Sequence, residues 1–279
     1  MNNPPAFHLR RLCLCFLLVI MILTAMNTGG LPVSVSAFLR GEVTPQLWQI
    51  WLSVRLPRIV LTVLVGMALA TAGVLLQGLF RNPLADPGLL GISSGAAVAV
   101  ALGIVFIAPY LNGAVTLYLH IITAFSGALC ISGLIFLLNR RRQPLLRLLL
   151  CGIAVNAISM SFVGVLNYLS DDKELRQFSL WMMGSTGHIS WTLLLPAIVL
   201  ALSGIIGFIG LVIPHLMRMI FGWHHRLLLV TSALAGALLL LLSDTLARTL
   251  VVPAEIPVGL LTGLLGAPYF LWLIFSVKE

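Results

Sequence analysis

Residues 55–97 read RLPRIVLTVLVGMALATAGVLLQGLFRNPLADPGLLGISSGAA, and they contain the pattern that decides the fold. Residues 59–80 are a nearly continuous apolar run, residues 81–87 interrupt it with polar side chains and prolines, and a second apolar run begins at Ile92. A helix needs about 20 apolar residues to cross a bilayer, and a barrel strand would show a period of two. The stretch therefore predicts two membrane-spanning helices joined by a short break.

The composition of the whole chain extends this prediction. Of its 279 residues, 60% are hydrophobic and only 9% are charged, with a mean hydropathy of +1.10. Soluble domains carry about 25% charged residues, so this chain cannot cover a water-facing surface. We predict an all-α fold, a polytopic membrane helix bundle of about eight transmembrane helices that forms one domain over residues 1–279. The net charge of +8 is not taken to indicate nucleic acid, because cytoplasmic loops of membrane proteins are rich in arginine.

Apolar runs of suitable length recur along the chain. The expected spans are Leu12–Met26, Ile59–Phe80, Ile92–Ala108, Val115–Leu138, Leu148–Tyr168, Trp191–Ile220, Leu227–Leu242 and Ile256–Phe275. The sixth span is long for one crossing, so we expect a kink near residues 204–210 or at Pro214. Between the first two spans, Trp48 and Trp51 predict an interfacial amphipathic helix, because tryptophan prefers the headgroup level.

Charge counting gives the orientation. With the N-terminus inside, ten of the 16 Lys and Arg residues fall in inner loops and six in outer loops, whereas six acids fall outside and two inside. Basic residues favour the cytoplasmic side. We therefore expect a multi-pass protein of the cell inner membrane with both termini cytoplasmic.

The break at residues 81–87 has two interpretations. Non-helical backbone near membrane depth is tolerated only where protein or a water-filled cavity supplies hydrogen-bond partners. Pro83 and Pro87 end helices. Asn82 and Asp86 can cap the next helix start, and Gly88 and Gly91 permit tight turns or close packing. From these residues alone, an ordinary capped turn and a pathway-lining break remain equally open.

Three stretches resemble one family of permeases. Residues 55–97, residues 207–226 (GFIGLVIPHLMRMIFGWHHR) and residues 243–275 (SDTLARTLVVPAEIPVGLLTGLLGAPYFLWLIF) resemble the permeases of ABC importers for iron–siderophore complexes, haem and cobalamin. The likeness runs over nearly the whole chain in the family's order. It implies a permease subunit for an iron chelate (a siderophore complex or haem). The implied partners are a second permease chain in a homodimer, cytoplasmic ATPase subunits, a periplasmic substrate-binding protein and membrane lipid.

The resemblance also implies roles for the residues at the break. Asn82, Pro83, Leu84 and Ala85 would line the translocation pathway near its cytoplasmic gate.

Arg55, Arg58 and Arg248 fall on the predicted outer face, against the positive-inside trend. A lone arginine there is most simply a side chain reaching from the membrane to the headgroup level. Three beside a pathway mouth look instead like a dock for acidic groups, and in the family arginines at these positions meet glutamates of the binding protein. Such pairs steer encounter and fix register more than they add affinity.

On the predicted cytoplasmic face we single out Arg140, Arg141, Arg142, His215 and Arg218. The spacing of the histidines fits no metal motif, and all four cysteines lie in apolar runs, so neither a metal site nor a disulfide framework is expected. The sequence lacks a phosphate-binding P-loop and a nucleophile elbow. We expect no catalytic residue and no cofactor, with ATP hydrolysis in a separate subunit.

The chain departs from the family pattern between Trp191 and His215. It is shorter than the family by roughly fifty residues, enough for a further crossing and a loop. The missing part includes the cytoplasmic loop with the pattern Glu-x-x-Ala-x-x-x-Gly, which in the family docks on the ATPase. We therefore expect eight crossings instead of about ten, and a defect in ATP-coupled uptake.

Two other classes of function remain open. A secondary transporter that works without an ATPase usually needs ionisable residues within the membrane, and only Asp244 and Glu255 are candidates among the acids. A non-transporting remnant would insert into the membrane but could not couple to an ATPase.

Overall fold

The structure is a computed structural model, and it describes residues 5–29, 40–41, 44–82, 85–111, 115–138, 145–185, 191, 206–222, 224–252 and 254–276. All regular structure within these ranges is helical. The elements are α1 (Pro5–Asn27), α3 (Pro45–Ile50), a π turn (Trp51–Arg55), α4 (Leu56–Phe80), a 3₁₀ turn (Pro87–Leu90), α5 (Ile92–Leu102), a π turn (Gly103–Ile107), a 3₁₀ turn (Ala108–Tyr110), α6 (Val115–Leu138), α7 (Leu145–Leu169), α8 (Asp172–Met182), α10 (Ile209–Phe221), α11 (His225–Thr249) and α12 (Val258–Ser276).

In the described part of the chain, 6 helices are long and apolar enough to cross a membrane. They are His8–Asn27, Trp48–Phe80, Ile92–Tyr110, Tyr118–Leu138, Arg147–Leu169 and His225–Thr249, and two shorter apolar helices are Ile209–Phe221 and Val258–Trp272. Each overlaps one expected span. The prediction of an all-α polytopic bundle with about eight membrane helices is confirmed.

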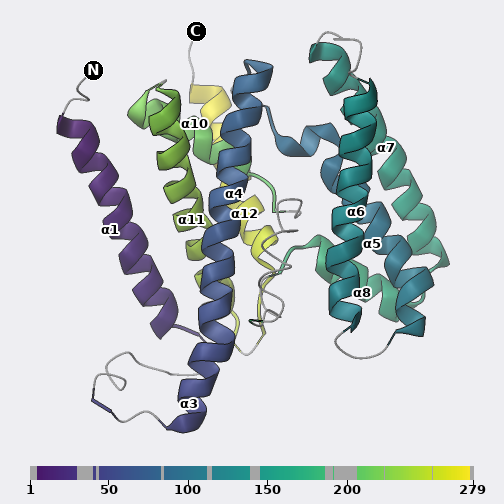
Figure 1. Cartoon of the computed structure of the whole chain (residues 1–279), viewed down its shortest axis with the longest axis horizontal. Helices are drawn as coiled ribbons and strands as arrows, with labels where there is room; N and C mark the ends of the chain where they lie inside the picture. Colours follow the sequence, from purple (N-terminus) through teal and green to yellow (C-terminus); the bar gives the residue numbers. More distant parts are fainter. Residues whose placement is uncertain are drawn as a thin grey trace.

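The helices form two groups (Figure 1): α1, α4, α10, α11 and α12 lie together, and α5, α6, α7 and α8 form the second group. The first group buries a core that includes Leu69, Ile213 and Leu240. The second buries a core that includes Val100 and Val163. Residues 81–91 join the two groups, so the break singled out in the sequence lies between them.

Both chain termini lie at the same end of the bundle (Figure 1), which we call the terminal end. There Arg10 Nη1 donates to the carbonyl of Ile220 at 2.7 Å, tying the start of α1 to the end of α10. The opposite end contains Arg55, Arg58 and Arg248, and we call it the arginine end. The bundle therefore has two chemically distinct polar ends.

Small residues let the helices approach closely. A Cβ atom added at Gly66 of α4 would overlap the backbone of Gly236 in α11, and one at Gly73 would overlap Gly210 in α10. Close approach at small residues is a common way to pack membrane helices, where water supplies no hydrophobic drive.

The expected interfacial helix before α4 is not a separate element. α3 and the π turn Trp51–Arg55 run straight into α4, giving one apolar helix of 33 residues, Trp48–Phe80. At 1.5 Å per residue this is about 50 Å, longer than the hydrocarbon core of about 30 Å. Trp48 and Trp51 stack with ring centroids 5.9 Å apart on this extension. The residues around the two tryptophans therefore lengthen the α4 helix and do not form a separate helix in the plane of the membrane surface.

Two contacts place the ends of the unusual sixth span. Trp191 Nε1 donates to the carbonyl of Leu52 at 2.7 Å, and Gln77 Nε2 donates to the carbonyl of Leu211 at 3.2 Å. Leu52 and Gln77 are separated by about 37 Å of helix. Trp191 and α10 therefore lie at opposite ends of α4, while the expected crossing between them falls in residues 192–205, outside the described residues.

The expected kink of the sixth span corresponds to a helix start. Residues 206–208 are not helical, and Phe208 has a φ of +69° before α10 begins at Ile209. Pro214 lies inside α10.

Candidate functional site

At the arginine end, the three arginines predicted to dock a partner come together in one cluster. Arg55 and Arg58 stand on successive turns where the π turn passes into α4, and Arg248 lies in the last turn of α11. All three are buried within the chain.

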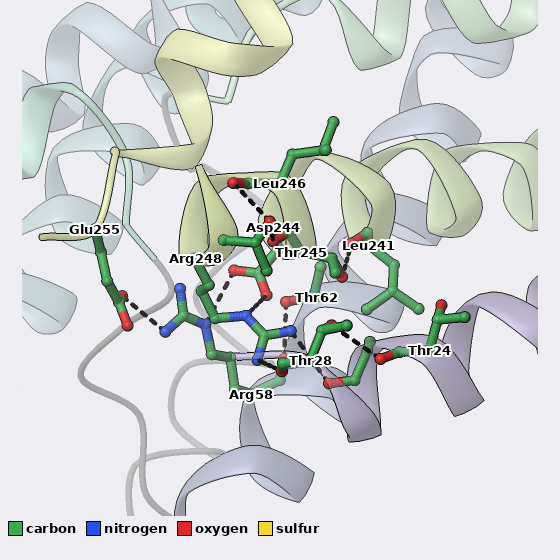
Figure 2. A network of polar contacts seen from close by, with 12 residues as sticks. Thr24, Thr28, Arg58, Thr62, Leu241, Asp244, Thr245, Leu246, Arg248 and Glu255 are labelled. Carbon is green, nitrogen blue, oxygen red and sulfur yellow. Dashed lines mark hydrogen bonds and ion pairs between the residues drawn. The ribbon is translucent and has the colours of Figure 1, made fainter. Parts of the chain in front are cut away.

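Asp244 lies at the centre of this cluster (Figure 2), on α11 one turn before Arg248. Arg58 Nε donates to Asp244 Oδ1 at 3.0 Å, and Arg248 Nε lies 3.1 Å from Asp244 Oδ2. The second contact is an ion pair between two side chains that lie four residues apart on the same helix. The Asp244 side chain is 0% exposed. A fully buried carboxylate is thus shared between two guanidinium groups from two helices.

The arginines also bind the carbonyl end of α1. Arg55 Nη1 donates to the carbonyl of Met26 at 2.8 Å, and Arg248 donates to the carbonyls of Ala25 and Thr28, each at 3.4 Å. The last carbonyls of a helix lack intrahelical donors and form the negative end of its dipole. The cluster therefore anchors the end of α1 on α4 and α11.

Glu255 is the peripheral member of the cluster. It comes from the segment between α11 and α12, and its Oε2 accepts from Arg58 Nη1 at 2.8 Å. Its side chain is 48% exposed, against 6% for Arg58. Figure 2 shows Glu255 reaching the cluster from a different segment than Asp244 does.

These contacts bear on two hypotheses for the arginine end: that its arginines dock a partner, and that Asp244 serves a secondary transporter. The three arginines are adjacent, as a docking site requires, but each is buried against groups of its own chain. The docking role stays a prediction. Asp244, the acid that a secondary transporter would need within the membrane, is here paired with two arginines of its own chain.

At the terminal end, α4 stops in a regular capping motif. Asn82 N donates to the carbonyl of Gln77 at 3.2 Å, and Arg81 N donates to the carbonyl of Gly78 at 3.3 Å. This is the Schellman pattern, in which the residue after the cap takes a left-handed conformation that favours glycine. Arg81 occupies that position with a φ of 49°.

The next turn uses the residues that the sequence suggested. Asp86 caps the 3₁₀ turn, accepting at Oδ1 from the Gly88 N–H at 2.9 Å. Gly91 has a φ of +76°, and a Cβ there would lie 3.0 Å from Val155 Cγ1 in α7. Both the turn and the close packing require glycine at this position.

Of the predicted pathway residues, the structure describes Asn82 and Ala85, while Pro83 and Leu84 lie outside the described residues. Asn82 is exposed and Ala85 is buried. Ala85 packs in a cluster with Phe80, Leu90, Ile135 and Leu148. The capped turn is present, and the pathway role stays a prediction.

Sequence reasoning missed Gln77, a buried amide in the last turns of α4. Pro214 has no N–H, so the carbonyl of Gly210 loses its donor within α10. Gln77 Nε2 lies 3.4 Å from that carbonyl and 3.2 Å from the carbonyl of Leu211, and Gln77 Oε1 accepts from Arg218 Nη2 at 2.9 Å. Two features of the sequence could have indicated this contact: Gln77 is a lone polar residue in one apolar run, and Pro214 removes an N–H from another.

Two further predicted residues, His215 and Arg218, lie at the same end on α10. His215 is on α10, with its Nδ1 buried and without a hydrogen-bond partner, and the buried Arg218 side chain turns toward Gln77. Arg140, Arg141 and Arg142 lie outside the described residues. No group of three His, Cys, Asp or Glu side chains that could hold a metal occurs among the residues that the structure describes.

The FecCD transport family model matches residues 14–202 and 192–276. The chain belongs to the FecCD transport family. The hemin transport system permease protein HmuU of Yersinia pestis is 47% identical over 325 residues, covering 96% of this chain and 97% of that protein. The vitamin B12 import system permease protein BtuC of Shigella boydii is 35% identical, covering 96% and 95%. A solved structure, described as an inward-facing conformation of a metal-chelate type ABC transporter, aligns with a TM-score of 0.83 at 31% identity, covering 96% and 99%.

The same matches locate an internal shortening. The alignment with HmuU runs over 325 positions and this chain has 279 residues, so at least 46 aligned positions (325 against 279) have no residue here. The two family matches share residues 192–202, which is the pattern expected when the chain joins two separated parts of a longer family sequence. The FecCD relatives thus contain a segment that this chain lacks near residues 192–202.

Proposed function

We propose that this chain is the permease subunit of an ATP-driven importer and that its substrate is haem. The observation that carries the proposal is the 47% identity with HmuU over nearly the whole length of both proteins. The lower identity with the vitamin B12 permease favours haem over cobalamin. The test gives the chain the HmuU segment that it lacks and measures uptake of radiolabelled haem with excess unlabelled cobalamin. Competition by cobalamin equal to competition by haem would contradict the substrate assignment.

The charges at the two ends of the bundle suggest its orientation in the membrane and the side on which each partner would bind. We place the terminal end in the cytoplasm, since Arg10, Arg81 and Arg226 are there, and basic residues favour that side. ATPase subunits would then meet the terminal end, and a periplasmic binding protein would meet the arginine end. A second copy of the chain would complete the pathway in the inner membrane.

We also propose that the cluster at the arginine end receives acidic groups of the binding protein. It contains three arginines and two acids among the described residues, so it has an excess of one positive charge. The residues Asn82–Ala85 would line the pathway at the other end, next to the junction between the two helix groups.

Coupling to ATP hydrolysis is the part of this function that the chain is expected to lack. An ATPase drives a permease only through a contact whose free energy differs between the two access states. In the family, the resemblance assigns this contact to a cytoplasmic loop. The segment expected to contain that loop is the one that this chain lacks near residues 192–202. We therefore expect assembly of the importer without efficient ATP-driven uptake.

A further inference from the structure

We infer that Glu255 is a displaceable occupant of a carboxylate-binding position on Arg58, and that an acidic side chain of the periplasmic binding protein takes its place on docking. This inference rests on the docking role proposed above. Its structural basis is the difference between the two acids of the cluster, Asp244 and Glu255.

The two acids are held very differently. Asp244 is 0% exposed, and each of its oxygens faces an arginine, so it cannot leave without exposing two buried cations. Glu255 is 48% exposed, and its Oε2 accepts one hydrogen bond from Arg58 Nη1 at 2.8 Å. About half of the Glu255 side chain is in solvent, where water screens its contact with Arg58, so this contact is easier to exchange than the one to Asp244.

The exchange also balances the charge. Removing one partner of a buried ion pair is costly because it leaves an uncompensated charge. When an incoming carboxylate replaces Glu255 on Arg58, one anion substitutes for another, and the cation keeps a partner throughout. Arg58 is thereby kept paired and oriented in the free permease, ready for a partner's acid.

The surroundings of Glu255 suit a protein partner. Residues 250–252 precede it at the end of α11, and Leu250, Val251 and Val252 are all exposed. Exposed apolar side chains a few residues from a charged group in the sequence suit a protein interface, where apolar contacts supply affinity and charges fix register. The inference therefore commits to an acidic segment of the binding protein rather than a small anion.

The test measures the dissociation constant of the purified full-length permease, in lipid nanodiscs, with its cognate periplasmic binding protein. Glu255→Gln removes the internal competitor while keeping the size of the side chain, and Glu255→Ala repeats the removal without a hydrogen-bonding group. Both should bind about threefold more tightly, the size expected for losing one exposed ion pair. Asp172→Asn is the matched control, because Asp172 is an exposed acid at the same end on α8, and it should leave the affinity unchanged.

The outcomes separate this inference from the docking proposal. Arg58→Lys keeps one charge but cannot hold two carboxylates in the same fork, so it should weaken binding if the arginine end docks the partner. Weaker binding by Arg58→Lys with unchanged or weaker binding by both Glu255 variants would overturn the inference and leave docking in place. If none of these variants changes the affinity, docking at this end is wrong, and the inference falls with it.

Discussion

Arg58 Nε lies 3.0 Å from Asp244 Oδ1, and this ion pair joins α4 to α11 with both side chains almost completely buried. Arg248 shares the same carboxylate and reaches the carbonyls that end α1. Three helices therefore meet at one buried acid. The cluster first of all holds the three helices together, and among its described residues Glu255 is the exposed member that a partner can reach.

Asp244→Asn should strongly destabilise the protein. An amide cannot neutralise the two arginines, and breaking a buried pair by removing one partner costs about 3–5 kcal/mol. The measurement is thermal unfolding in detergent, monitored as the loss of the monodisperse peak in size-exclusion chromatography after heating. Asp172→Asn, an exposed acid on α8, should unfold like the unmodified chain. Equal stability of both variants would contradict the central position of Asp244.

Gln77 and Pro214 should be energetically coupled. Gln77→Leu leaves the carbonyl of Gly210 without a donor, which costs about 1–3 kcal/mol for a buried group. In a Pro214→Ala background, the new backbone N–H can bond that carbonyl, so the same substitution should cost about 1 kcal/mol less. A double-mutant cycle on unfolding free energies measures the difference. The loss of the Arg218 contact occurs in both backgrounds and cancels.

The control for this cycle is Pro268, which lies inside α12. Gln77→Leu combined with Pro268→Ala should show additive costs. Additivity with Pro214→Ala as well would mean that Gln77 does not stand in for the missing N–H.

The apolar helices could be predicted because their signal is local. Long apolar runs, the cap at Asp86 and the glycine at position 91 each need only a few neighbouring residues, and the structure confirms them. The helix start before α4 was predicted less well. Tryptophans at residues 48 and 51 fit an interfacial helix or an extension of α4 equally, and helical continuity decided between them.

The polar clusters could not be predicted, because they join residues far apart in the chain. Arg58 and Asp244 are 186 positions apart, and Gln77 and Gly210 are 133 apart. Nothing near Arg58 in the sequence indicates that an acid of α11 will bury it. The sequence predicted that the three arginines share the outer face, as side chains reaching the headgroup level or as a dock for acidic groups, but not that they pair with Asp244.

A cysteine at Ala85 tests whether the break lines the pathway. In a background without native cysteines, Ala85→Cys in membranes should react with a charged thiol reagent at least about tenfold faster than Ala97→Cys, because thiolate chemistry requires water. Both alanines are buried within the single chain, at 3% and 1% exposure, so the comparison isolates access from a pathway. Equal protection of both would favour the plain capped turn.

Reporter fusions test the orientation. Arg226 lies in the first turn of α11, at the terminal end, and Lys173 lies in the first turn of α8, which begins at the arginine end (Figure 1). Green fluorescent protein fused after Arg226 should fluoresce, and alkaline phosphatase fused after Lys173 should be active, because each reporter works on one side of the membrane. Phosphatase activity after Arg226 would overturn the orientation.

The most direct measurement for the account as a whole is ATP-driven haem uptake into proteoliposomes that contain the permease and its ATPase, with binding protein supplied. The unmodified chain is compared with a chain that carries the missing HmuU segment between Trp191 and Ile206. We predict uptake at the ATP-free background for the unmodified chain and a rise of about tenfold, or 1.4 kcal/mol in barrier, for the extended one. Robust ATP-dependent uptake by the unmodified chain would contradict the loss of coupling, and failure of both chains would contradict the assignment as a haem permease.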